Sequence, residues 1–124
     1  MQGRVAIPSM APGGLDAVRS GHFGHCDAFT VVHVDGDDIL DIQIVANQEH
    51  VQGGCMVPVN LLTSHNVDAI IVGGIGMRPL MGFRQAGIRV YYEAEEPRIR
   101  PVVEQWMKGM LAEISDNQVC GGGH

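Results

Sequence analysis

The stretch from Val67 to Tyr92, VDAIIVGGIGMRPLMGFRQAGIRVYY, predicts a strand, a glycine turn, a helix and a second strand in immediate succession. Val67–Val72 is a short apolar run rich in β-branched residues, which is typical of a strand buried on both faces of a sheet. The helix follows the glycine turn and stops at Gly87, and Ile88–Tyr92 supplies the next strand. A right-handed parallel crossover is the simplest connection between the two strands.

The glycine turn of this unit is Gly73, Gly74 and Gly76, placed where the backbone must change direction between strand and helix. Such a turn directs unpaired backbone N–H groups and the positive end of the helix dipole at one spot, which favours an anion. Arg78, at the mouth of that spot, can add a positive charge or simply face water. A tight turn without any ligand would also explain the glycines.

The rest of the chain predicts three further strands and two further helices around this unit. The expected strands are Arg4–Pro8, Ala28–Val34 and Ile39–Val45, and the expected helices are Cys55–His65 and an amphipathic Ile99–Ile114. The second and third strands alternate apolar and polar residues around a short turn, so they form a hairpin. The predicted fold is α/β, a mixed five-stranded sheet with three helices in the order βββαβαβα. Residues 1–114 form its single domain, and 115–124 form a flexible Gly-rich tail.

The bulk composition narrows the class of protein. A chain of 124 residues is long enough for one layered core. Its net charge of −6, with only eight Lys and Arg, argues against nucleic acid as a partner. No run is apolar enough to cross a membrane and no secretory signal is evident, so we expect a cytoplasmic protein. Three cysteines at irregular spacing, Cys26, Cys55 and Cys120, favour free or metal-binding thiols over a disulfide framework.

Three loops carry the side chains that could bind a metal ion or an anion. Loops that follow parallel strands lie at the same edge of a sheet, so the second and third of these loops can meet there. The first loop, which contains His22, reaches the same edge only if the long segment before it folds back. Thiolate and imidazole groups suit copper, zinc and iron-sulfur species, although no C-x-x-C pair fixes two ligands on one element. The loops hold His22, His25 and Cys26, then His50 and Cys55, then the turn Gly73–Gly76.

The motifs SGHFGHCDAF, QGGCMVPVNLL and the opening stretch together resemble the dinitrogenase iron-molybdenum cofactor biosynthesis family, over roughly Arg4–Met110. That family includes accessory proteins that carry cofactor precursors during nitrogenase assembly and a small protein that holds a molybdenum, copper and sulfide cluster. The resemblance implies a ribonuclease-H-like α/β sheet. It also implies that an anionic metal-sulfur cluster, of Mo/Fe or Mo/Cu type, is bound or delivered.

The resemblance also implies which residues hold the cluster. Many members have Arg after HFG, where this chain has His25 and then Cys26, which exchanges a fixed charge for metal ligands. The implied cluster-binding residues are His22, Phe23, Gly24, Gly53, Gly54, Gly73, Gly74, Ile75, Gly76, Met77 and Arg78. The candidate metal ligands are His22, His25, Cys26, His50 and Cys55.

The expected function is that of a non-catalytic carrier in metallocofactor assembly, with the cluster or its precursor and cluster donor or acceptor proteins as partners. Two alternatives stay open. Cys26 could be the nucleophile of an enzyme with a histidine as its base, although no carboxylate can be assigned to orient that base. The second alternative is a structural or adaptor domain, in which the glycine turn only closes the fold.

Overall fold

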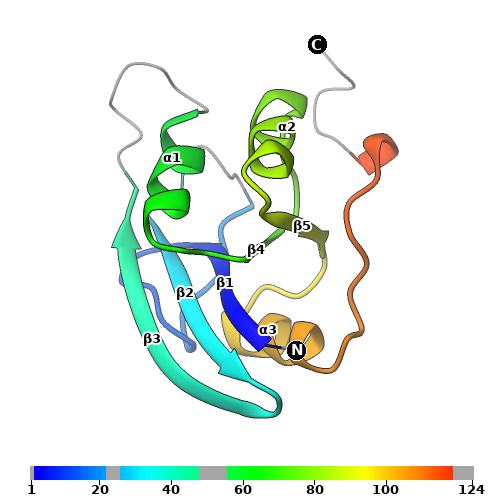
Figure 1. The fold of residues 1–124 in the computed structure, drawn as a ribbon. Helices are drawn as coiled ribbons and strands as arrows, with labels where there is room; N and C mark the ends of the chain where they lie inside the picture. The colour runs from blue at the N-terminus through cyan, green and yellow to red at the C-terminus, as the bar shows by residue number, and fades with distance from the viewer. Residues whose placement is uncertain (1, 22–25, 48–55, 119–124) are drawn as a thin grey trace.

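The computed structural model describes residues 2–21, 26–47 and 56–118. Its elements follow the predicted order βββαβαβα, which confirms the α/β class and the number of strands and helices (Figure 1). The bounds are β1 Gln2–Ser9, β2 Ala28–Asp35, β3 Asp38–Ala46, α1 Met56–Ser64, β4 Ala69–Val72, α2 Met77–Gln85, β5 Arg89–Tyr92 and α3 Ile99–Met107. A short 3₁₀ helix, η2, follows at Asp116–Gln118. Within these residues no helix is both long and apolar enough to cross a membrane.

The five strands form one mixed sheet in the order β3-β2-β1-β4-β5. The pairs β1–β2 and β2–β3 are antiparallel, as the predicted hairpin requires, whereas β1–β4 and β4–β5 are parallel. These directions mean that four of the strands end at the same edge of the sheet, namely β1, β3, β4 and β5. Strand β2 begins at that edge. We call it the loop edge, because all the chemically interesting loops connect there.

Helices cover both faces of the sheet, with α1 and α2 together on one face and α3 on the other (Figure 1). Strand β4 shows the two faces most clearly, because all four of its residues are buried. Ile70 and Val72 pack with Leu62 of α1 and Leu80 of α2. Ala69 and Ile71, which alternate with them along the strand, pack with α3. The prediction of a strand buried on both faces is therefore confirmed.

Helix α3 is shorter than the sequence predicted, since it ends at Met107 and the predicted helix to Ile114 was wrong. Gly109 follows with a φ of +70°, a left-handed conformation that ends a helix readily. The chain then runs beside the outer edge of β5, where Tyr92 N donates to Ala112 O (3.1 Å) and Ile114 N donates to Val90 O (2.8 Å). Ile114 is buried, but it packs with the cluster on the α1 and α2 face of the sheet and is not part of α3.

After Ile114 the chain stays in contact with the domain through η2. Asp116 forms an ion pair with Arg84 of α2, with 3.2 Å between Nη1 and Oδ1. Arg84 also donates to the Ile114 carbonyl at 3.2 Å. The last part of the predicted tail, residues 119–124, lies outside the described residues.

Candidate functional site

The described flanks of the first two candidate loops meet at the loop edge. Asn47, directly after β3, donates its side-chain N–H to the Cys26 carbonyl at 2.9 Å. Its backbone N–H donates to Asp27 O at 3.2 Å. Because Cys26 precedes β2 and Asn47 follows β3, these bonds hold the end of one loop against the start of the other. No pattern in the sequence indicates this role for Asn47 directly, although a polar residue immediately after a strand is a common loop anchor.

Cys26 is the predicted ligand or nucleophile that the structure describes. This residue is only 1% exposed and lies in the same apolar cluster as Phe29 and Ile75. The Asn47 Nδ2 atom lies 3.6 Å from the sulfur, within the range of an N–H···S hydrogen bond. An N–H donor at sulfur suits the thiolate form that metal ligation needs. The near-complete burial leaves the sulfur little direct access to solvent.

The other predicted ligands, His22, His25, His50 and Cys55, lie outside the described residues, as do Phe23, Gly24, Gly53 and Gly54. Among the residues with described positions, no group of three or more His, Cys, Asp or Glu side chains could hold a metal ion. The ligand assignments therefore stay predictions.

The glycine turn is described in full and lies between β4 and α2, at the loop edge. Gly76 is the N-cap of α2, with extended backbone (φ −76°, ψ 164°) and no side chain to accept the helix amides. The first hydrogen bond of the helix runs from Leu80 N to Gly76 O at 3.2 Å. The N–H groups of Gly74 to Arg78 have no acceptor among the described residues. These amides are therefore unpaired donors at a helix N-terminus, and the anion site that the sequence predicts at this turn stays a prediction.

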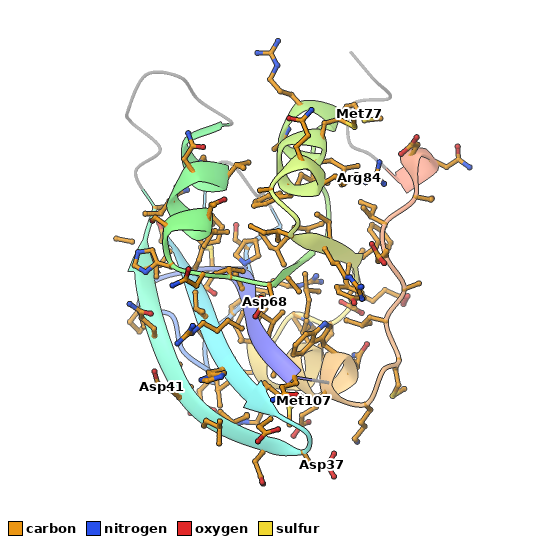
Figure 2. The ribbon with its side chains drawn as sticks, in the orientation of Figure 1. Asp37, Asp41, Asp68, Met77, Arg84 and Met107 are labelled. Carbon is orange, nitrogen blue, oxygen red and sulfur yellow. The ribbon has the colours of Figure 1, made fainter. Side chains whose placement is uncertain are left out.

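The turn offers a ligand its backbone N–H groups, whereas its side chains are either packed in the core or exposed to solvent. The Ile75 side chain is buried in the α1 and α2 cluster, so only its peptide group can serve a ligand. Met77 is partly buried against the same cluster, and it marks the start of α2 in Figure 2. Arg78 is exposed, so its guanidinium can reach an anion held by the amides.

A buried arginine, which sequence reasoning missed, lies directly beneath the turn. The side chain of Arg19 is 6% exposed, forms an ion pair with Glu93 (Nη2 to Oε1, 3.1 Å) and also donates to the Glu93 carbonyl. A Cβ added at Gly73 would lie 3.3 Å from both Arg19 Nη1 and Glu93 O. Gly73 therefore permits the guanidinium to approach the backbone closely. No sequence signal could have paired Arg19, in a long loop, with a turn so far along the chain.

Comparison with known proteins identifies the family of this chain. Residues 4–109 match the family model described as dinitrogenase iron-molybdenum cofactor. The chain belongs to this family. An uncharacterized protein of Methanocaldococcus jannaschii is 31% identical over 114 residues, which are 90% of this chain and 91% of the relative.

Solved structures of similar proteins share the fold of this family member. The apo form of the orange protein from Desulfovibrio gigas superposes with a TM-score of 0.82 at 21% identity, over 93% of this chain and 95% of that protein. The protein PH0822 gives a TM-score of 0.75 at 29% identity, over 91% of this chain and 97% of its own. These structures thus share the mixed α/β arrangement of five strands and three helices that the sequence predicts.

Proposed function

We propose that this protein binds and carries an anionic metal-sulfur cluster, of Mo/Fe or Mo/Cu type, at the loop edge. The observation that carries the proposal is the run of N–H groups from Gly74 to Arg78, which have no acceptor in the described structure and lie at a helix N-terminus. Membership of the family supports a role in metallocofactor assembly, with cluster donor and acceptor proteins as its partners in the cytoplasm.

The amides suit such a cargo because sulfide-bridged clusters carry net negative charge. Backbone N–H groups and the positive end of a helix dipole stabilise an anion without supplying a mobile counter-ion. The protein as a whole has a net charge of −6, which repels anions at long range. A local cluster of donors, with the Arg78 guanidinium beside it, is therefore needed to favour an anion at this edge.

Direct bonds to the metal would come from the soft side chains of the two neighbouring loops. Cys26 and Asn47 anchor those loops to each other beside the turn. In this proposal Cys26, Cys55, His22, His25 and His50 supply the thiolate and imidazole ligands. The remaining predicted residues of the loops, Phe23, Gly24, Gly53 and Gly54, shape the space around the cluster.

Anaerobic reconstitution with tetrathiomolybdate and copper tests the proposal directly. We expect a visible charge-transfer band that stays with the protein through gel filtration, together with a fixed ratio of metal to protein. The triple variant Cys26→Ser, Cys55→Ser and His25→Ala should lose the band. Cys120→Ser, which removes the third cysteine and no proposed ligand, is the matched control and should keep it.

Two outcomes would contradict the proposal in different ways. Colour that survives the triple variant would remove the ligand assignments and leave an anion held by the amides alone. No bound metal in the unaltered protein would remove the carrier function itself. In the alternative enzyme, alkylation kinetics without metal would show one hyper-reactive thiol. The burial of Cys26, which is 1% exposed, argues instead for slow alkylation.

A further inference from the structure

A cavity lies at the edge of the sheet opposite to the loop edge, where β1, β4 and β5 begin. Its volume is about 450 Å³, which is enough for a small organic molecule. The cavity shares no residue with the proposed cluster site, and Asp68 on its wall is labelled in Figure 2. Its lining residues are Gln2, Asp68, Ala69, Gly87, Arg89, Tyr91 and Trp106.

The indole of Trp106 is the first sign that this cavity takes a ligand. Trp106 is 3% exposed, and its Nε1–H has no acceptor among the described residues. A buried donor without an acceptor is costly, so its partner is expected to be water or a ligand. Tyr91 packs edge-on against the indole, with ring centroids 6.4 Å apart and planes at 75°, and this fixes the orientation of the donor.

Arg89 and Tyr91 supply further donors from β5. They are two residues apart on one strand, so their side chains leave the same face of the sheet. Neither the Arg89 guanidinium nor the Tyr91 hydroxyl bonds to another residue in the described parts of the chain. The residues that line this cavity thus include one that carries a guanidinium and one that carries a buried indole N–H without an acceptor. A guanidinium and an N–H group are the kinds of donor that the two oxygens of a carboxylate accept from.

Asp68 adds one negative charge to the wall and is held firmly in place. Its Oδ2 accepts the Arg4 N–H at 2.8 Å, and its carbonyl accepts the Arg89 N–H at 3.1 Å. A Cβ on Gly3 would lie only 2.6 Å from Oδ2, and Gly3 has a φ of +124°. Only glycine fits there, so the backbone of β1 is adapted to the position of this carboxylate.

We propose that this cavity binds a small carboxylate-bearing molecule, with an α-amino acid as the preferred form. The carboxylate accepts from the Trp106 indole and the Arg89 guanidinium. The ammonium of an amino acid lies near Asp68, which balances the charge of Arg89 within the cavity. This inference is independent of the metal-cluster function, because it uses different residues at a different edge.

Trp106 is the only tryptophan of the chain, so ¹⁵N-labelled protein gives a single indole N–H resonance. Titration with L-alanine and with propionate compares two ligands that differ in the amino group. We expect a saturable shift of the indole signal with L-alanine in the millimolar range or tighter, and weaker binding of propionate. Equal affinities would assign carboxylate recognition without a contribution from Asp68.

Variants distinguish recognition from a general salt effect. Arg89→Gln should weaken L-alanine binding about tenfold or more, because a charge-assisted hydrogen bond is lost. Arg100→Gln removes the same charge from α3, where the guanidinium pairs with Asp16, and should leave the affinity unchanged. Asp68→Asn should remove the preference for L-alanine over propionate. An indole signal that neither compound moves, or an Arg89→Gln protein with unchanged affinity, would overturn the proposal.

Discussion

Helices α2 and α3 end in the same way but begin in opposite ways. Each has nine residues, and each is followed by a glycine with positive φ, Gly87 at +80° and Gly109 at +70°. In both, the residue after this glycine donates back into the helix, from Ile88 N to Phe83 O and from Met110 N to Gln105 O (both 2.9 Å). Both helices therefore end in the same Schellman arrangement.

The first turn of α3 is closed by the protein's own acceptors. Ile99 N donates to Ala17 O (3.2 Å) and Arg100 N donates to Leu15 O (3.0 Å). In the turn before the helix, the Glu93 carboxylate accepts the amides of Glu95 and Glu96 at 3.1 to 3.3 Å. At the start of α2 the corresponding amides have no such partner among the described residues. The open start lies at the loop edge, beside Cys26 and Asn47, whereas the closed start has no donors left for a ligand.

The largest expected effect comes from Arg19, because it joins the two turns that follow β4 and β5. Replacing it with Met leaves the Glu93 carboxylate largely buried without its cation, which should cost about 3 kcal/mol of unfolding free energy. Urea denaturation measures this loss. Glu93→Gln in the same protein should restore part of the stability, since the remaining partner is then neutral.

The exposed pair between Arg100 and Asp16 is the control for that variant. Its side chains are 49% and 91% exposed, compared with 6% and 12% for Arg19 and Glu93. Arg100→Met should therefore change the unfolding free energy by less than about 1 kcal/mol. If the two arginine variants lost the same unfolding free energy, burial of the Arg19 and Glu93 pair would contribute nothing to stability.

The second prediction closes the open start of α2. Gly76 has a negative φ, and a Cβ there meets only Pro79 at 3.7 Å, so a side chain fits. In Gly76→Asp the carboxylate caps the free amides and should stabilise the protein by about 0.5 kcal/mol. Tetrathiomolybdate binding should weaken about tenfold or more, because the amides are occupied and the site gains a negative charge.

The variant Met81→Glu shows whether Gly76→Asp weakens binding by capping the amides or only by adding a negative charge. Met81 is exposed within α2, so this variant adds the same charge to the helix without an acceptor at its first turn. It should bind tetrathiomolybdate nearly as well as the unaltered protein. If both variants lose binding equally, general repulsion explains the effect and the amides are not the site.

The sequence predicted the parts of the fold that depend on local patterns. These parts are the apolar run of β4, the glycine turn and the short β5, which were all visible in the residues. The use of the turn as an anion site stays a prediction. The length of α3 was predicted wrongly because Ile114 continues the helical spacing, while Gly109, which ends the helix, was overlooked. Arg19 and Asn47 could not be predicted, since their contacts depend on how distant loops meet.

The third prediction tests the shared helix ends. Nothing in the described structure lies within 4 Å of a Cβ added at Gly87 or Gly109, so alanine meets only the backbone strain of its positive φ. Gly87→Ala and Gly109→Ala should therefore each lose about 1 kcal/mol of unfolding free energy. A clear difference between the two losses would mean that the two ends are not equivalent.

The smallest effect is expected at Met110, the residue after Gly109. Its backbone N–H completes the end of α3, but its side chain is 67% exposed, whereas Ile88 in the same place after α2 is 4% exposed. Met110→Ala keeps the backbone bond and removes little buried surface. The unfolding free energy should change by no more than about 0.5 kcal/mol in urea denaturation. A loss above about 1 kcal/mol would show that the Met110 side chain, and not its backbone alone, closes the helix.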